Sequence, residues 1–494
     1  MHSMPNILLI TDDQHRWDFY NSRTVPGLRV PTLDRLRAEG TTLEHAYANT
    51  PVCMPARMTW CHGRYASQLC DGVMHNWHSW PVRISSMPNA LKTAGYRTAL
   101  IGKLHAQGRH HNDLTDEVFI KETQGRGFDD VLEVSGKSFS YWTDCHWTHH
   151  LREKGLLEAY RRDLERRVEQ LGGDEPSDAS FLEPADSADG FIGGHARRWL
   201  QSYNEDSPFF LHASFCGPHF PIDPPAAYHR HRAEDMPDPP GVDDLARITY
   251  WKQRTAAYCG MIEQIDDEVG KLLDVLDQRG LRENTLVIFT TDHGDMMGHF
   301  DQALKGTPYD TSARTPIVAR LPGVVPAGRT LDGMIEAVDL PVTLMDVAGL
   351  GDDPEPYLNA SPGRSFWSYL RGEADAPRQW AYAEAGRRGG SGGRSICCHD
   401  PMLAERYRQV EANHVGWRMV CDQRWKYVYY PHTDDELFDL QSDPWEKRNR
   451  AADPACGERV TRMRGWLIES MRLSVAPSIF KIGEPTYVNE RYQG

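Results

Sequence analysis

The sequence predicts an α/β fold with a large mixed, mostly parallel sheet flanked by helices, followed by a smaller C-terminal α+β subdomain. Short apolar strands alternate with amphipathic helices over most of the chain, and this order covers both faces of a parallel sheet with helices. The composition changes after residue 375, where a Gly-rich stretch precedes a hairpin pattern. We therefore expect a main α/β domain over residues 1–375 and an α+β unit with a small antiparallel sheet, a helix and a tail over 376–494.

The strands of the main domain are predicted from short apolar runs. The run "NILLIT" (6–11) ends directly at two acidic residues, which is typical of a buried parallel strand. Further strands are expected at 97–102, 208–215, within 281–295, and at 316–322.

The helices of the main domain are predicted from spacing and end signals. The segment 31–40 carries Leu33 and Leu36 at helical spacing, begins with Pro31 and ends in Gly40. A long amphipathic helix is expected at 250–279 and a further one at 338–348.

The C-terminal unit begins with a Gly-rich loop over 386–401. A β-hairpin is expected at 416–431 with its turn near Asp422, followed by a helix near 454–472. The tail that follows could pack on the body or on a neighbouring copy, so a homo-oligomer stays open.

Composition excludes several classes of protein. The chain has 494 residues, 40% of them hydrophobic, and a formal net charge of −15. An acidic protein is not expected to bind nucleic acid or an anionic membrane. No apolar run approaches the roughly 18–20 residues of a membrane helix, and the N-terminus lacks the features of a signal peptide. The ten cysteines are irregularly spaced, which favours reduced thiols. We expect a soluble, cytoplasmic protein of enzyme size.

Acidic residues follow two of the predicted strands. Asp12 and Asp13 end the first, and Asp292 with His293 ends a later one. Because ligands bind at the carboxyl ends of the strands in such folds, these groups should meet at one sheet edge. Crowded carboxylates require a cation or protons to offset their repulsion. A divalent metal such as Ca²⁺, Mg²⁺ or Mn²⁺ is therefore predicted, the alternative being that the acids cap helices or form surface turns.

Basic and imidazole side chains also follow candidate strands. These residues are Arg57, Lys103, His105, His219 and Lys305. In an extended segment, Lys103 and His105 would share a face. Such a set suits a tetrahedral oxyanion, such as sulfate or phosphate, and stabilises a leaving alkoxide. Taken singly, each lysine could be a solvated charge and each histidine an ordinary satisfied side chain.

Cys53 lies at the predicted start of a helix, four residues before Arg57. A thiolate would be stabilised there by the helix dipole and the arginine. A cysteine-dependent phosphatase loop would need arginine at position 59, which is threonine. A zinc site would have to use Cys61, Cys70, His75 and His78, which lack the paired spacing of structural sites. A packed cysteine is the remaining alternative.

Several motifs of the chain, taken together, resemble those of the type I, formylglycine-dependent sulfatase family of the alkaline phosphatase superfamily. The signature Cys-x-Pro-Ser/Ala-Arg, with glycine ten residues after the cysteine, is similar to "CMPAR" (53–57) and Gly63. The wider pattern agrees, in "NILLITDDQ" at the start, "GKLH" (102–105), "PHFP" (218–221), "TTDHGDMMG" (290–298), "KGTPYDTSARTPIVARLPG" (305–323) and "ELFDLQSDPWEKRN" (436–449). The family includes arylsulfatases, choline sulfatases and phosphonate monoester hydrolases.

The resemblance implies an alkaline-phosphatase-like fold and a sulfuric ester hydrolase. It implies that a formylglycine-generating enzyme oxidises Cys53 to Cα-formylglycine, whose hydrate attacks sulfur and then releases sulfate when its second hydroxyl loses a proton. Asp12, Asp13, Asp292 and His293 would bind one divalent metal, Ca²⁺ being expected and Mn²⁺ or Mg²⁺ being alternatives. Arg57 would steady the formylglycine oxygens. His105 would be the base for release, with Lys103 beside it. His219 and Lys305 would contact the sulfate and the leaving oxygen.

Two alternatives stay open beside hydrolysis of a sugar, aryl or alkyl sulfate. One is a phosphonate or phosphate ester hydrolase with nearly the same site, and the other is a catalytically silent, metal-binding relative. His293 stands where many sulfatases have asparagine, and Trp60 and Cys61 depart from the usual residues after the signature.

Substrate specificity is expected to reside in loops. The candidates are residues 70–80, 105–150 and 386–418. The histidines and tryptophans of the second segment could line a pocket or form an ordinary half-exposed surface; they are His110, His111, Trp142, His146, Trp147, His149 and His150. A second anionic group on the substrate could be bound by Arg387, Arg388 and Arg394.

Overall fold

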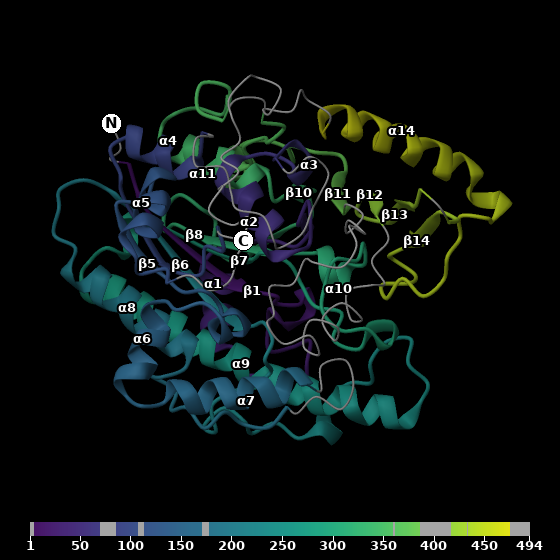
Figure 1. Ribbon diagram of the computed structural model, residues 1–494. Coiled ribbons are helices and arrows are strands. Elements are labelled where there is room, and N and C mark those ends of the chain that lie inside the picture. The colour runs from purple at the N-terminus through teal and green to yellow at the C-terminus, as the bar shows by residue number, and fades with distance from the viewer. Residues whose placement is uncertain are drawn as a thin grey trace, which may run out of the picture.

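The protein is described here from a computed structural model covering residues 4–69, 85–106, 113–169, 177–358, 361–385, 416–431 and 433–474. A large central sheet is sandwiched between two layers of helices, and a smaller sheet with one long helix lies at one end (Figure 1). The predicted Gly-rich loop at 386–401, the tail after residue 474 and the arginines 387, 388 and 394 lie outside the described residues.

The main sheet has eight strands in the order β5-β4-β6-β1-β7-β8-β2-β9. Their bounds are β1 Asn6–Asp13, β2 Thr41–Leu43, β4 Arg97–Gly102, β5 Asp130–Glu133, β6 Phe209–Pro218, β7 Thr285–Thr291, β8 Ile317–Arg320 and β9 Arg329–Leu331. The five strands from β5 to β7 run parallel, whereas β8 is antiparallel to both of its neighbours. The predicted mixed, mostly parallel sheet is confirmed.

The central strand β1 is buried along its whole length because successive side chains enter different cores. Leu8 and Ile10 pack with one set of helices, and Ile7 and Leu9 pack with another. Figure 1 shows α8 and α9 on one side of the sheet and α4 and α11 on the other. The helix bounds are α1 Pro31–Glu39, α2 Cys53–His62, α3 Ala66–Leu69, α4 Met87–Thr93, α5 Glu117–Gly125, α6 His146–Glu153, α7 Leu157–Glu169, α8 Ala188–Ser202, α9 Leu245–Gln278, α10 Asp310–Ala313, α11 Asp339–Val347 and α12 Trp367–Arg371.

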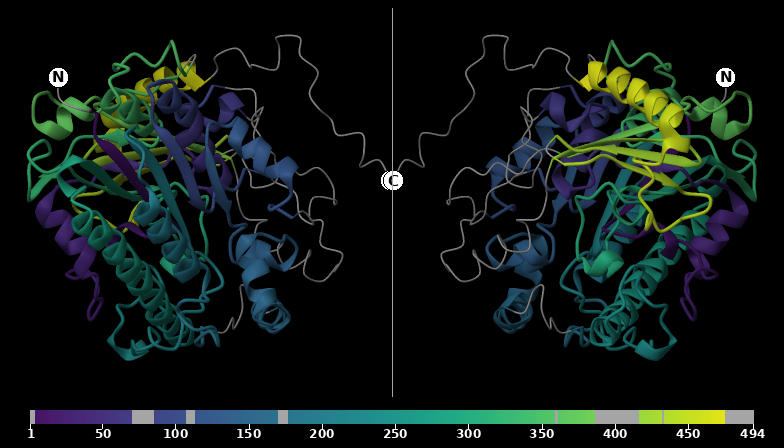
Figure 2. Two further views of the ribbon diagram at one scale, coloured as in Figure 1. Left: turned by 90° about the vertical axis from the view of Figure 1, so that its left-hand side faces the viewer. Right: turned by 90° about the vertical axis from the view of Figure 1, so that its right-hand side faces the viewer.

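The C-terminal sheet is antiparallel and has the order β11-β12-β13-β14. Its strands are β11 Ala381–Ala385, β12 Trp417–Cys421, β13 Trp425–Tyr429 and β14 Glu436–Asp439, and the helix α14 Gly457–Ser474 packs against it (Figure 2). The hairpin predicted at 416–431 is therefore present. A short two-stranded parallel ladder pairs β3 Ala46–Tyr47 with β10 Ile335–Glu336, both within residues 1–375. The division at residue 375 stays a prediction.

A buried ion cluster joins the C-terminal unit to the main domain. Lys426 of β13 donates from Nζ to Oδ1 of Asp310 (2.5 Å) and to Oε1 of Glu446 (2.6 Å). All three side chains are buried. A buried ammonium is tolerated only when it is paired in this way, so the cluster fixes the relative position of β13 and α10.

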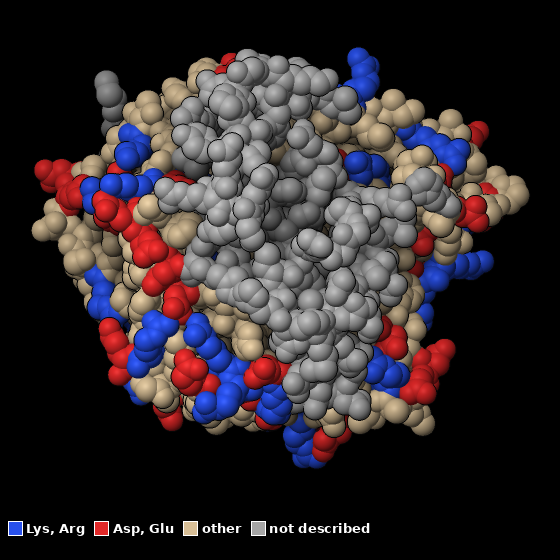
Figure 3. All heavy atoms as spheres, in the orientation of Figure 1, with Lys and Arg blue, Asp and Glu red and all other residues tan. Residues whose placement is uncertain are grey.

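None of the helices in the described part of the chain is long and apolar enough to cross a membrane. On the face shown in Figure 3, acidic and basic side chains of the described residues are interspersed around the rim.

Candidate active site

Four neighbouring strands bring the predicted site residues to one edge of the main sheet. The strands β4, β6, β1 and β7 are adjacent and parallel, so their carboxyl ends meet. Asp13 ends β1, Lys103 follows β4, His219 follows β6 and Asp292 follows β7. The predicted convergence of these residues is observed.

Cys53 is the first residue of α2, all of whose ten residues are buried. No side chain caps the start of this helix, so its N-terminal dipole faces the site. The helix ends at Gly63 with φ 62°, a left-handed conformation that favours glycine. A Cβ there would also lie 2.7 Å from Cδ1 of Leu358. The glycine ten residues after Cys53 therefore ends the helix that carries the cysteine.

Four potential metal ligands form one compact group. These are Asp13, Cys53, Asp292 and His293, whose ligand atoms all lie within 4.8 Å of one another. Nε2 of His293 lies 3.2 Å from Sγ of Cys53, while its Nδ1 donates to the carbonyl oxygen of Gly294 (2.8 Å). That second contact orients the ring so that Nε2 faces the group, as is usual for a ligating histidine.

Asp12 is not part of this group. Its Oδ2 accepts a hydrogen bond from Nδ1 of His15 (2.6 Å), and its Oδ1 is buried without a partner among the described residues. The pairing of β1 with β6 shifts register between Thr11 and Asp13, and the two carboxylates have different partners, His15 for Asp12 and Lys103 for Asp13. The assignment of Asp12 as a metal ligand stays a prediction.

Arg57 lies one helical turn after Cys53 and holds the acids in place. It donates from Nε to Oδ2 of Asp292 (2.8 Å) and from Nη2 to Oδ2 of Asp13 (3.1 Å). Its Nη1 donates to the carbonyl oxygen of Lys103 (2.6 Å) and to Oγ of Ser214 (2.9 Å). Burial alone would lower the pKa of Arg57, but Asp292 and Asp13 raise it, so the guanidinium stays charged.

Lys103 pairs with the same carboxylate, Nζ lying 2.6 Å from Oδ2 of Asp13. Burial opposes ionisation of Asp13, but the charges of Lys103 and Arg57 hold its pKa well below the ordinary value. His105 has φ 59°, so the segment is not extended there as predicted. Both ring nitrogens of His105 are buried without a partner among the described residues. Burial together with Lys103 lowers the pKa of His105 to about 4.

Lys305 and His219 contact each other on another side of the group. His219 donates from Nδ1 to the carbonyl oxygen of Phe220 (2.7 Å), so its Nε2 lone pair accepts from Nζ of Lys305 (2.8 Å). Burial and the charge of Lys305 lower the pKa of His219. The imidazole is therefore neutral, and Lys305 is the donor of this hydrogen bond.

The thiol of Cys53 lies in a strongly cationic environment. Burial opposes its ionisation, but Lys305, Lys103 and His293 hold its pKa well below the ordinary value. The other described cysteines with a shifted pKa, Cys61, Cys216, Cys259 and Cys421, have it raised, chiefly by burial. Position 53 is thus distinguished electrostatically from these buried cysteines.

Two polar side chains in contact with the site were not predicted from the sequence. Ser214 of β6 donates to the carbonyl oxygen of Lys103 (2.7 Å) while accepting from Arg57. Gln14 accepts from Lys305 and donates to Asp295. The position of Gln14 directly after Asp12 and Asp13 could have indicated that it belongs to the site. Ser214 is a single serine within an apolar strand, and nothing in the sequence indicates its contact with the site.

The residues fit a divalent cation. Burial and the neighbouring charge of Asp13 raise the pKa of Asp292, which shows that the two carboxylates repel each other. Oδ1 of Asp12, the residue before Asp13, is a further buried acceptor with no partner among the described residues. Carboxylate oxygens with one imidazole suit Ca²⁺, Mg²⁺ or Mn²⁺.

Four members of the histidine- and tryptophan-rich set lie in α6, namely His146, Trp147, His149 and His150, whereas Trp142 follows the 3₁₀ helix Ser138–Tyr141. Nε2 of His149 lies 2.6 Å from Asp113 and Nε2 of His150 lies 2.8 Å from Asp186. Trp147 is fully buried and donates to the carbonyl oxygen of Asp186 (2.9 Å). His110, His111 and the loop 70–80 lie outside the described residues, as do three of the four candidate zinc ligands. The fourth, Cys61, packs in the apolar core.

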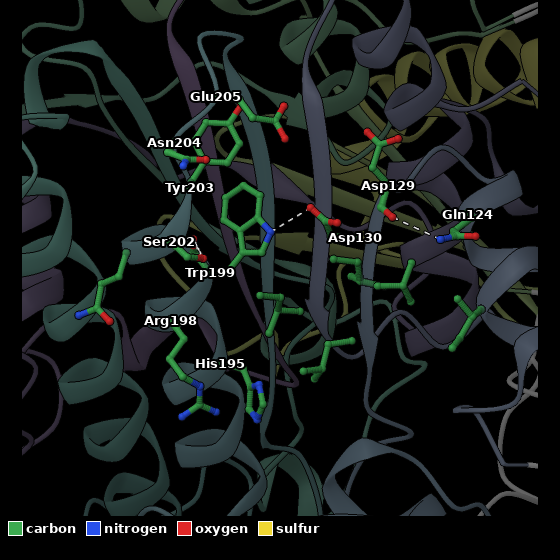
Figure 4. Close-up of a pocket in the computed structure, with 16 residues that line it drawn as sticks. Gln124, Asp129, Asp130, His195, Arg198, Trp199, Ser202, Tyr203, Asn204 and Glu205 are labelled. Atoms are coloured by element: carbon green, nitrogen blue, oxygen red, sulfur yellow. Dashed lines mark hydrogen bonds between the residues drawn. The ribbon is translucent and has the colours of Figure 1, made fainter.

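A broad surface groove of about 940 Å³ lies at the edge strand β5, away from the site. Figure 4 shows Trp199 donating from Nε1 to Oδ2 of Asp130 (3.0 Å) across this groove. It contains none of the predicted site residues, so we assign it no part in the chemistry.

Comparison with known proteins agrees with the geometry. The family model described as Sulfatase matches residues 5–350, more than half of the chain. An arylsulfatase of Clostridium perfringens is 26% identical over 507 residues, covering 94% of this chain and 94% of that protein. A choline-sulfatase of Rhizobium meliloti is 25% identical, covering 91% and 83%. The crystal structure of a phosphonate monoester hydrolase of Agrobacterium radiobacter matches with a TM-score of 0.75 at 25% identity, covering 96% and 97%.

Proposed function

Because the chain belongs to the sulfatase family and is thus a sulfuric ester hydrolase, we propose that it cleaves a sulfate monoester with a formylglycine derived from Cys53. The observation that carries this proposal is the position of Cys53, which starts a buried helix within 4.8 Å of the ligand atoms of two acids and a histidine. A side chain placed there can be both a nucleophile and a neighbour of a bound cation.

The cation would be held by Asp13, Asp292 and His293, with Asp12 as a further candidate. When bound, it would act as a Lewis acid toward the ester oxygens. The hydrate of formylglycine would supply one hydroxyl as the nucleophile and a second for release of sulfate. We take Ca²⁺ as the first candidate metal, with Mn²⁺ favoured more than usual because His293 offers nitrogen.

Arg57, Lys103 and Lys305 bind and orient the anionic group. Arg57 forms ion pairs with Asp13 and Asp292. It therefore fixes the positions of these two carboxylates relative to the side chain at position 53. Lys305 and His219 serve the leaving oxygen, because Nζ of Lys305 is a hydrogen-bond donor and Nε2 of His219 orients it by accepting from it.

His105 is proposed as the base for release of sulfate. Its pKa of about 4 keeps the ring neutral near pH 7, and its nitrogens have no competing partner among the described residues. A neutral imidazole close to the position 53 side chain can remove a hydroxyl proton. Maturation would require a formylglycine-generating enzyme, and the substrate class is a sugar, aryl or alkyl sulfate.

A phosphonate or phosphate ester hydrolase is the second candidate, favoured by the match to the phosphonate monoester hydrolase structure. Steady-state kinetics with a 4-nitrophenyl sulfate and a 4-nitrophenyl phenylphosphonate separate the two, because the leaving group is held constant. We expect the higher kcat/KM with the sulfate. A higher kcat/KM with the phosphonate would assign the second function. If neither ester is turned over, the result would favour the catalytically silent, metal-binding relative.

A further inference from the structure

We propose that Lys137 is a positioning residue for the leaving-group side of the site, acting through the loop that carries His219. This inference rests on the proposed function, since it concerns the part that His219 and Lys305 play in departure of the alcohol. Lys137 lies immediately before the short 3₁₀ helix Ser138–Tyr141 and is only 6% exposed.

The ammonium of Lys137 is directed at one loop. Nζ donates to the carbonyl oxygen of Pro221 (2.7 Å) and to Oδ1 of Asp223 (2.8 Å). Pro221 lies two residues after His219, so both contacts hold the segment that follows the histidine. A buried lysine carries a large desolvation penalty unless its hydrogen bonds are satisfied. These two contacts therefore lock the loop in the observed place.

The end of β6, which precedes His219, is held from α8. Oδ1 of Asp189 accepts from the backbone nitrogens of Cys216 (2.8 Å) and Gly217 (2.9 Å). A Cβ at Gly217 would lie 2.5 Å from Oδ2 of Asp189, so the carboxylate is packed directly against the backbone. His219 therefore lies between two buried charged groups that hold the chain on either side of it.

Lys137 acts through the loop rather than on the substrate. An internal cavity beside Lys137, Asp189 and Asp223 has a volume of about 10 Å³. This is room for about one water molecule. An ester does not fit there, so the effect of Lys137 on turnover must pass through the position of His219 and its contact with Lys305.

This arrangement has a kinetic signature. If the loop shifts, Lys305 loses one of the two acceptors that orient it, the other being Gln14, and proton donation to the leaving oxygen becomes less effective. A nitrophenolate leaves readily without a proton, whereas the more basic phenolate requires one. Loss of Lys137 should therefore slow the ester with the poorer leaving group far more than the ester with the better one.

The test is a leaving-group series in wild type and Lys137→Met, using aryl esters of graded phenol acidity in the ester class that the enzyme turns over. We expect the loss of kcat/KM to be about tenfold greater for phenyl than for 4-nitrophenyl esters. A smaller folded fraction scales all esters equally and cannot produce this difference. An equal loss across the series would contradict the inference.

If Lys137→Met fails to fold, the double variant Lys137→Met/Asp223→Asn is used instead. It removes both charges of the Lys137–Asp223 pair, so neither is left buried without its partner. It should show the same steeper leaving-group dependence, and a wild-type dependence would overturn the inference. Lys426→Met is the matched control, because it removes another buried lysine that pairs with acidic side chains but is far in sequence from this loop. It should lower the free energy of unfolding. It should leave the leaving-group dependence of kcat/KM the same as in wild type.

A readout independent of turnover separates failure of this inference from failure of the proposed function. In a crystal structure of Lys137→Met/Asp223→Asn, we expect the loop to move and the contact between His219 and Lys305 to lengthen. An unmoved loop would refute the positioning role whatever ester the enzyme hydrolyses. If wild type turned over no ester while the loop moved, the proposed function would fail and the structural part of the inference would stand.

Discussion

His293 and Cys53 are 240 residues apart in the sequence, yet Nε2 of His293 lies 3.2 Å from Sγ of Cys53. The contact joins the loop after β7 to the first residue of α2, at the edge where the parallel strands end. It also brings a nitrogen ligand and the candidate nucleophile to the same point. The chemistry proposed for the site depends on this juxtaposition.

Binding of a divalent cation should stabilise the protein strongly, because the cation offsets repulsion between Asp13 and Asp292. A ligand that binds only the folded state at a hundred times its dissociation constant adds about 2.7 kcal/mol. We expect Ca²⁺ to raise the Tm and chelation to reverse the rise. Asp292→Asn should reduce the Ca²⁺-dependent rise, as followed by thermal unfolding with and without the ion. An equal Ca²⁺-dependent rise in Tm in the variant and in wild type would show that Asp292 does not bind the cation.

The pH profile should reflect the neutral state of His105. Burial and Lys103 lower the pKa of His105 to about 4, so the base is protonated only as the pH falls toward that value. We therefore expect no loss of kcat from this group between pH 8 and 6, and a loss at more acidic pH. In Lys103→Met the missing positive charge should move this acid limb to higher pH, whatever the absolute rate. An unmoved limb would mean that another group controls it.

The buried Lys426 cluster should contribute strongly to stability. Lys426→Met would leave Asp310 and Glu446 buried without their cation, and breaking a buried pair in this way costs about 3–5 kcal/mol. Lys252→Met is the control, since Lys252 pairs with the exposed Asp238; such pairs contribute about 0–1 kcal/mol. Urea unfolding measures both. Equal effects of the two substitutions would contradict the structural assignment of the cluster.

Gly102 should be intolerant of a side chain. Its φ is 118°, and a Cβ there would lie 1.9 Å from the carbonyl oxygen of Ser214. Gly102→Ala must push β4 away from β6 and displace Lys103, so we expect lower stability and lower kcat/KM together. Gly194→Ala in α8 has no such clash, and alanine there should stabilise the helix by up to about 1 kcal/mol. Activity and urea unfolding of both variants give the comparison.

Much of the fold is predictable from local patterns in the amino-acid sequence. The strands β1 and β4, the helices α1 and α11, and the C-terminal hairpin lie where apolar runs, end signals and turn residues predict them. The convergence of Asp13, Lys103, His219 and Asp292 was also predictable, since parallel strands share one carboxyl edge. The antiparallel direction of β8 was not, because it depends on the path of the chain between strands.

The contacts within the site depend on register, which single-sequence reasoning does not supply. Ser214 meets Arg57 only because β6 pairs with β1 and β4 in one alignment. Asp12 and Asp13 look equivalent in the sequence, but Asp12 contacts His15 whereas Asp13 contacts Cys53, at a point where the register of β1 with β6 shifts. The left-handed φ of His105 is likewise not predictable from the sequence, because residues other than glycine rarely adopt it.

The most direct test of the account is the mass of the peptide that contains residue 53, measured on the purified enzyme together with the turnover of Cys53→Ala. We predict the lower mass of an aldehyde in place of the thiol, and loss of activity by at least about a thousandfold in the variant. Cys61→Ala, in the same buried helix, should retain activity. An unmodified cysteine in fully active enzyme, or an active Cys53→Ala protein, would contradict the formylglycine mechanism.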